Sequence, residues 1–236
     1  MRAHSGNRQA LTRVQAQVVR CTRCPRLTRY RQHVAAVKVR RYRDWEYWGR
    51  PIPSFGDPGG RLLILGLAPA AHGGNRTGRI FTGDRSGDWL YRALYTYGFA
   101  NQPTSIAQGD GLQLQDCYIT ASVRCAPPQN RPTRQELENC RSYLLRELAL
   151  LPKIRVVVAL GRIAFDTFLQ TCREMGVPPV RPRPQFAHGA RFHLPGGLTL
   201  LASYHPSQQN TLTRRLTGPM FHAIFREAHR ILSESG

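Results

Sequence analysis

The alternation of short apolar segments with amphipathic helical segments constrains the fold of this chain most strongly. The apolar segments are Arg61–Leu67, Asp116–Ser122, Arg155–Leu160 and Leu198–Ser203. Each segment has the length of a buried strand rather than that of a core helix. Strands that alternate with helices are typical of a mostly parallel sheet covered on both faces. The sequence therefore predicts an α/β fold with three layers, a four-stranded mainly parallel sheet flanked by helices.

Helical patterns fill the intervals between these strands. A capping box formed by Thr133 and Glu136 marks one helix start. The expected helices are 86–98, 133 to about 150, 161 to about 174, and 219–233. Residues 1–20 read as a weak helix or a partly ordered arm. With no internal repeat or low-complexity tract, we expect residues 1–236 to form a single domain.

The charge balance points to a polyanionic partner. The chain has 34 Lys and Arg against 14 Asp and Glu, which gives a formal net charge of +20, and only Lys38 and Lys153 are lysines. A protein this basic usually meets nucleic acid, and guanidinium groups suit bidentate phosphate contacts. An arginine-rich genome explains part of this bias, but it does not explain the scarcity of acids.

The N-terminal segment has no apolar core of the kind that secretory signals carry. The longest apolar stretch, Leu62–Ala71, is too short to span a membrane and contains Gly66 and Pro69. We therefore expect a cytoplasmic, nucleoid-associated protein. In that compartment disulfides are rare, so the six cysteines are expected to be metal ligands, catalytic thiols or buried apolar residues.

Four of the cysteines have the spacing of a metal site. Cys21 and Cys24 form a C-x-x-C pair, and the more distant Cys125 and Cys140 would complete a four-sulfur shell. Spacing alone favours structural zinc over an iron–sulfur cluster, with a redox or incidental C-x-x-C as the alternative. The other two cysteines, in a strand and in a late helical turn, are expected to be buried and inert.

The loops that follow the predicted strands carry the candidate functional residues, because ligands of such sheets bind beyond the carboxyl ends of the strands. The glycine-rich loop 66–90 is neither a P-loop nor a G-x-G-x-x-G motif, so it argues against a nucleotide-binding transferase. In it, Phe81 could stack a base or pack in the core. Asp84 could act as a general base, stabilise a cation or cap a helix. His205, in the sequence SYHPSQQN, fits an active-site loop, and His72 is a weaker candidate.

Several of these segments together resemble the uracil-DNA glycosylase superfamily, and within it the fifth family, the type-b enzymes of thermophiles and actinobacteria. The matching segments, in the family's order, are CTRCPRL, PIPSFGDPGGRLLILGLAPAAHGGNRTGRIFTGD, VRCAPPQNRPT, ALGRIAF and ASYHPSQQNT. The resemblance implies the same four-stranded α/β fold. It also implies a structural [4Fe–4S] cluster bound by Cys21, Cys24, Cys125 and Cys140, in place of the zinc that spacing favours.

The resemblance further implies a monofunctional hydrolase of base excision repair that acts as a monomer on double-stranded DNA. Such an enzyme flips a deaminated base out of the duplex and hydrolyses its N-glycosidic bond, leaving an abasic site. The implied catalytic residues are Asp84, Asn130 and His205. The implied substrate-binding residues are Gly66, Ala68, Phe81 and Ala121. Arg76, Arg79, Arg85 and Arg214 are candidate phosphate contacts, and the segment Gln208–Arg215 resembles the loop that enters the duplex.

Departures from the sister families predict a broad range of substrates. The fourth family has Glu where this chain has Leu67, and the first family has a water-activating Asp where this chain has Ala68–Ala71. Sister families also place a uracil-reading Asn at the position of Ala121. Without that side chain, we expect release of uracil and of other deaminated bases such as hypoxanthine. The rival hypothesis is a metal-stapled DNA-binding module without catalysis.

Overall fold

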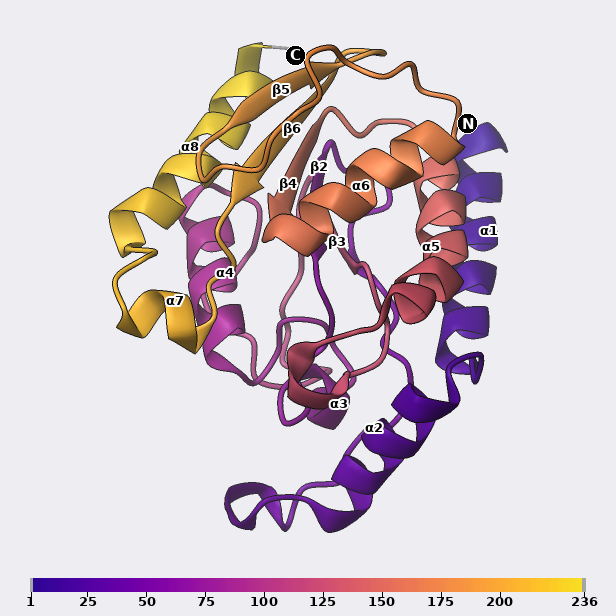
Figure 1. Cartoon of the computed structure of the whole chain (residues 1–236). Coiled ribbons are helices and arrows are strands. Elements are labelled where there is room, and N and C mark those ends of the chain that lie inside the picture. The colour runs from indigo at the N-terminus through magenta and orange to yellow at the C-terminus, as the bar shows by residue number, and fades with distance from the viewer. Residues whose placement is uncertain (1, 235–236) are drawn as a thin grey trace.

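The computed structural model describes residues 2–234, and its elements follow the predicted alternation (Figure 1). The α-helices are α1 (Arg2–Val19), α2 (Pro25–Val37), α3 (Gly74–Thr77), α4 (Arg85–Thr96), α5 (Arg134–Leu150), α6 (Arg162–Glu174), α7 (Gln208–Leu212) and α8 (Gly218–Glu234). The strands are β1 (Phe55–Gly56), β2 (Leu62–Gly66), β3 (Cys117–Ala121), β4 (Val156–Leu160), β5 (Arg191–Leu194) and β6 (Leu198–Ser203), and the 3-10 turns are η1 (Arg40–Tyr42) and η2 (Pro128–Asn130).

The sheet has the strand order β1-β3-β2-β4-β6-β5. Its four central strands are parallel to one another, which confirms the predicted sheet. Two short antiparallel edge strands, β1 and β5, extend it to six strands. Sequence pattern revealed neither of them, because β1 has two residues and β5, with sequence RFHL, has no continuous apolar run.

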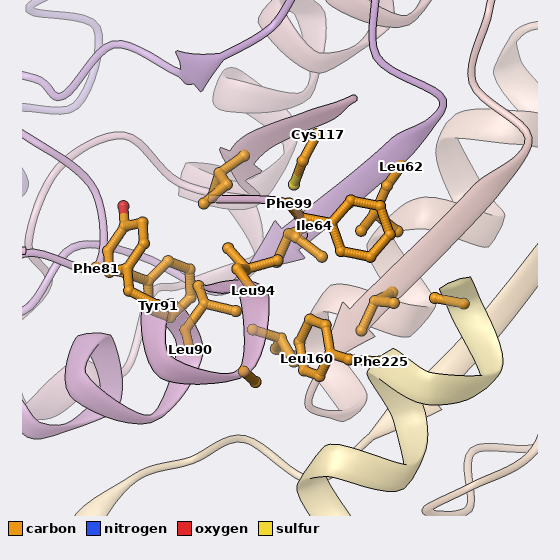
Figure 2. Packing of buried hydrophobic residues seen from close by; sticks show 14 of the residues in the cluster. Leu62, Ile64, Phe81, Leu90, Tyr91, Leu94, Phe99, Cys117, Leu160 and Phe225 are labelled. Atoms are coloured by element: carbon orange, nitrogen blue, oxygen red, sulfur yellow. The ribbon is translucent and has the colours of Figure 1, made fainter. Parts of the chain in front are cut away.

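The parallel strands are buried on both faces, and alternate residues enter two separate cores. Leu62 and Ile64 of β2 belong to the core that contains residues of α4 and α8, whereas Leu63 and Leu65 belong to the core that contains residues of α5 and α6. Figure 2 shows Ile64 and Phe81 in the first of these cores, beside residues of α4. Burial of this continuous apolar surface supplies the main driving force for the fold.

Of the two alternatives for the first 20 residues, the structure has the helix. Helix α1 packs against α5, and its Leu11, Val14 and Val18 are buried. These residues recur at the spacing of one helical face, so the stability of α1 comes from packing rather than from strong intrinsic helix propensity. No helix within residues 2–234 has the length and apolar character needed to cross a membrane.

A buried polar network joins α5 to the sheet and to α1. Glu147 is fully buried and forms an ion pair with Arg124. Its carboxylate also accepts hydrogen bonds from Thr120 Oγ1 at 2.8 Å, Ser54 Oγ at 2.7 Å and Gln15 Nε2 at 2.6 Å. With its charge balanced and its oxygens bonded, this carboxylate has no capacity left for a ligand.

Candidate functional site

A cavity of about 820 Å³ lies beyond the carboxyl ends of the parallel strands. Its walls come from the loops after β2, β3 and β6, which contribute Asp84, Asn130 and Gln208 respectively. This is the edge at which the strand alternation predicted a binding site. Two of the three predicted catalytic residues, Asp84 and Asn130, therefore line one cavity although they are far apart in sequence.

Asp84 both caps α4 and faces the cavity. Its side chain accepts a hydrogen bond of 3.0 Å from the backbone N–H of Gly87. The carboxylate sits against Gly73, where a Cβ atom would lie only 2.2 Å from Oδ2, so this position has no room for a side chain. Burial raises the pKa of Asp84, and backbone hydrogen bonds from Gly87 and Ser86 oppose the rise. Asp84 forms no ion pair with any residue that the structure describes.

Phe81 and His205 form a neighbouring aromatic pair. Their rings stack with centroids 6.0 Å apart and an interplanar angle of 28°. The phenyl ring lies so close to Gly66 that a Cβ there would be 2.7 Å from its Cζ atom. Phe81 also has a φ of +52°, which is unusual for a bulky residue and marks a backbone held by its surroundings. Neither ring belongs to the cavity wall itself.

His205 is held just after β6. The side-chain amide of Asn210 donates a 2.8 Å hydrogen bond to its carbonyl oxygen, and a Cβ added at Gly161 would lie 3.5 Å from the Cβ of His205. Burial lowers the pKa of His205 to about 4. The imidazole is therefore neutral near pH 7 and retains one N–H that can donate a hydrogen bond.

Asn130 is exposed and reaches the cavity from η2. Asn130 and Gln129 have φ values of +56° and +53°, in the left-handed region. Asn tolerates this conformation better than most residues, which suits it to this turn.

The three remaining predicted substrate-binding positions lie beneath the cavity rather than on its wall. Gly66 and Ala121 pair with each other at the ends of β2 and β3. Ala121 is buried in the same core as Phe81. Ala68 packs against the small apolar cluster that contains Cys125 and Cys140.

Two of the four arginines named as candidate phosphate contacts, Arg76 and Arg79, are not on the open surface, although Arg76 lines the cavity. Both guanidinium groups are buried, and Arg79 forms an ion pair of 2.5 Å with Asp110. Because a local sequence pattern does not show which arginines fold inward, burial had to come from the structure. Arg85 and Arg214 are exposed, so they remain candidates.

The segment after His205 forms the short helix α7, capped by Ser207. At its end Leu212 is 64% exposed. An exposed apolar residue here suits insertion between stacked bases.

The four cysteines with metal-site spacing lie near one another. Cys125 and Cys140 share an apolar cluster against which Cys24 packs, and none of the four forms a disulfide. Burial and then the neighbouring thiols raise the pKa of Cys125 to about 12. Within residues 2–234, no group of three or more His, Cys, Asp or Glu side chains is gathered around a single ion position. An iron–sulfur cluster is larger than an ion and binds each thiolate at a different iron atom, so this donor set suits a cluster.

One wall of the cavity did not follow from the sequence. It comes from Tyr42 and Trp45, together with His72, whose Nδ1 lies 3.1 Å from the hydroxyl of Tyr47. In the sequence, residues 39–49 interleave arginine with aromatic residues, but this pattern does not show which cavity Tyr42 and Trp45 cover.

Comparisons with known proteins agree with this geometry. The model of the family described as "Uracil DNA glycosylase superfamily" matches residues 53–229. A type-5 uracil-DNA glycosylase of Mycobacterium leprae is 49% identical over 228 residues, covering 96% of this chain and 98% of the relative. One from Thermus thermophilus is 51% identical over 213 residues, covering 89% and 93%. A type-4 uracil-DNA glycosylase of Pyrobaculum aerophilum is 29% identical over 161 residues, covering 68% and 65%.

Proposed function

Because this chain belongs to the uracil-DNA glycosylase superfamily, we propose that it hydrolyses the N-glycosidic bond of uracil in DNA, using Asp84, Asn130 and His205. One observation carries the assignment of residues. Asp84 is a carboxylate without an ion-pair partner among the described residues, and it faces a cavity that Asn130 also lines. The rings of Phe81 and His205, which follow β2 and β6 respectively, stack on each other.

A base inside a duplex cannot reach this cavity, so the enzyme must first flip the nucleotide out of the stack. The cavity of about 820 Å³ has room for a whole nucleotide. In this proposal the base passes the cavity wall and stacks on Phe81, which lies just before the cavity-lining residues Gly83 and Asp84 in the chain. Leu212, exposed on α7, fills the space that the base leaves in the duplex.

In the chemical step the C1′–N bond breaks and its electron pair leaves with the base. The sugar then carries positive charge, which the carboxylate of Asp84 offsets. Water adds its oxygen to C1′, and Asp84 accepts one water proton, which passes on to the base anion. The neutral imidazole of His205 donates a hydrogen bond to a carbonyl oxygen of that anion. Asn130, at the cavity wall, holds the base or the attacking water.

The experiment that tests this function compares a uracil-containing duplex with the same duplex containing thymine. After incubation with the protein, strand scission that requires alkali and occurs only at uracil supports a monofunctional glycosylase. Scission without alkali would indicate a lyase. Binding without base release would support the rival DNA-binding module.

We also propose that the enzyme releases several deaminated bases in addition to uracil. Ala121 is buried beside Gly66 and offers no group that recognises one edge of the base. Hypoxanthine is therefore expected as a second substrate, because no unpaired polar side chain penalises it. Single-turnover release should be measured on uracil and hypoxanthine duplexes for the wild type and Ala121→Asn. The variant should favour uracil, whereas wild-type release of uracil alone would refute the proposal whether or not the variant folds.

A structural [4Fe–4S] cluster on Cys21, Cys24, Cys125 and Cys140 completes the proposal. When bound, it cross-links the segment before α2 to the loop after β3 and to α5, and it supplies no step of the hydrolysis. The protein purified anaerobically should be brown. Cys125→Ser should bleach it, whereas Cys172→Ser, at a buried thiol on α6, should not. A colourless wild type that holds one zinc would overturn this part.

A further inference from the structure

Arg76 is buried without an acidic partner among the described residues, in contrast to Arg79 and Arg124, which form ion pairs. Its guanidinium carbon lies 3.9 Å from the ring centroid of Tyr42 and 4.1 Å from that of Trp45. These two rings are nearly perpendicular, at 77°, so they form an aromatic corner around the cation. Nε donates to the carbonyl oxygen of His72 at 2.8 Å, and Nη2 donates to the backbone carbonyl before Asp84 at 3.0 Å.

The rings belong to a segment, residues 39–49, that we name the arm. The arm docks on α3 through backbone hydrogen bonds from Trp48 to Arg76 at 2.9 Å and from Gly49 to Asn75 at 3.0 Å. Together with α2 it extends beyond α3 at the end of the molecule where the parallel strands finish (Figure 1). The arm and the cavity therefore face the same end.

The arm carries three exposed arginines and two exposed acids, Asp44 and Glu46, so it has a small net positive charge. Arg40, Arg41 and Arg43 are exposed and form no ion pair with any described residue. Arg41 also lines the cavity. Exposed guanidinium groups without acidic partners are free to neutralise phosphates.

We propose that the arm grips the DNA strand beside the flipped nucleotide, and that Arg76 is the positioning residue that couples the arm to the turn bearing Asp84. The proposal rests on the glycosylase function and extends it to a region that follows none of the parallel strands. Through its bond to Gly83, Arg76 fixes the residue directly before Asp84. Through the aromatic corner, the same cation fixes the arm. Displacement of the arm would therefore shift the carboxylate, and a small misplacement of a reacting group slows the reaction severely.

Arg76 also acts on Asp84 through its charge. Burial has the largest effect on the pKa of Asp84 and raises it; backbone hydrogen bonds from Gly87 and Ser86 lower it, Asp88 raises it, and Arg76 lowers it by the least of these. The charged or titratable groups that line the cavity with Asp84 include Arg41, His72, Arg76, Arg85 and Asp88. Removing the cation at residue 76 should therefore move the ionisation of Asp84 to higher pH.

The grip is tested by binding to a duplex with an uncleavable abasic-site analogue at several salt concentrations. Arg40→Gln/Arg43→Gln should lower the slope of log affinity against log salt by about 0.9 for each phosphate that the arm no longer neutralises. The matched control is Arg181→Gln/Arg183→Gln, which removes the same charge beside Leu194, the last residue of β5, at a site that shares no lining residue with the cavity. Equal slopes for the two double variants would overturn the grip, and this readout does not depend on catalysis.

The coupling is tested by the pH profile of single-turnover uracil release. Arg76→Gln should slow release by about tenfold to a hundredfold and shift the acid limb to higher pH. Arg76→Lys should slow release but leave the acid limb in place, because the charge is kept. Trp45→Ala alone should slow uracil release, but in an Arg76→Gln background it should slow release little further. The control Tyr95→Ala, which removes an exposed aromatic side chain on α4, should not change the release rate.

An unmoved acid limb in a folded Arg76→Gln variant, or additive effects of Trp45→Ala and Arg76→Gln, would overturn the coupling. Thermal unfolding of each variant identifies the folded ones. If the wild-type protein releases no uracil, the proposed glycosylase function is wrong. The salt dependence of binding still tests separately whether the arm contacts DNA.

Discussion

Asp84 is a partly buried carboxylate and Glu147 a fully buried one, and their surroundings differ in every respect that matters for chemistry. Glu147 is ion-paired with Arg124 and accepts hydrogen bonds from three further side chains. Asp84 accepts hydrogen bonds from backbone N–H groups at the start of α4 and has no ion-pair partner among the described residues. A saturated carboxylate stabilises the scaffold, whereas an unsaturated one beside a cavity can still bind a proton or face a cation.

The arginines near these acids show the same difference. Arg124 balances the charge of Glu147 directly, but Arg76 is turned toward aromatic rings and backbone carbonyls. The guanidinium group of Arg76 therefore forms no ion pair with Asp84. This arrangement leaves the carboxylate available for a sugar cation, although its burial without a paired charge raises its pKa.

The largest effect is expected for Asp84→Ala. Loss of the carboxylate should slow single-turnover uracil release by about 10²–10⁴, the usual contribution of such a group, with duplex binding retained. Asp166→Ala, at an exposed position on α6, is the control for loss of one acidic charge. An unchanged rate for Asp84→Ala would move the catalytic role to another residue, with Asn130 the next candidate.

Glu147→Ala should lower the stability of the protein but leave its rate of uracil release unchanged. Removing one partner of a buried ion pair leaves Arg124 uncompensated, so the free energy of unfolding should fall by about 3–5 kcal/mol. The fraction that remains folded should release uracil at the wild-type rate. Urea unfolding at fixed pH measures the first quantity, and a loss below about 1 kcal/mol would contradict the structural role of this network.

The pH dependence of uracil release sharpens the comparison further. Burial raises the pKa of Asp84, so protonation should inactivate the enzyme at a higher pH than an ordinary aspartate pKa would give. Below that pH, the rate of uracil release should fall by about tenfold per pH unit. His205, with a pKa of about 4, should add no limb near the ordinary histidine pKa of about 6.5. Single-turnover rates measured from acidic to neutral pH would show whether the Asp84 limb is present and the histidine limb is absent. A limb at the ordinary histidine pKa that vanishes in His205→Ala would contradict this assignment.

The smallest effect concerns stability at the active site. A raised native pKa means that ionisation of Asp84 destabilises the fold as pH rises through that pKa. Asp84→Asn, which keeps the helix cap, should therefore stabilise the protein at neutral pH by about 0.5–2 kcal/mol. The gain should disappear in acid, where the native carboxyl is protonated. If the Tm of Asp84→Asn is lower than that of the wild type at neutral pH and equal to it in acid, ionised Asp84 stabilises the fold and this prediction is wrong.

The fold was largely predictable because its determinants are local. The apolar runs that became β2, β3, β4 and β6 and the capping box of α5 each lie within a few consecutive residues. The placement of Asp84 and Asn130 at one strand edge also followed, since the carboxyl ends of parallel strands meet there. The edge strands, the arm over the cavity and the burial of Arg76 and Arg79 did not follow, because each depends on contacts between distant segments.

The sequence by itself determined the class of sheet and the loops whose residues line the cavity. Tertiary structure decided how each of those residues is used. Gln15 and Glu147 are 132 positions apart, yet their hydrogen bond helps to saturate one carboxylate. Arg76 stacks against Tyr42 and Trp45, more than 30 positions earlier in the chain, and forms no ion pair with Asp84. The local sequence pattern predicts the element or loop that carries a charged residue. The burial and the hydrogen-bond or ion-pair partners of that residue set its reactivity, and they depend on the packing of distant segments.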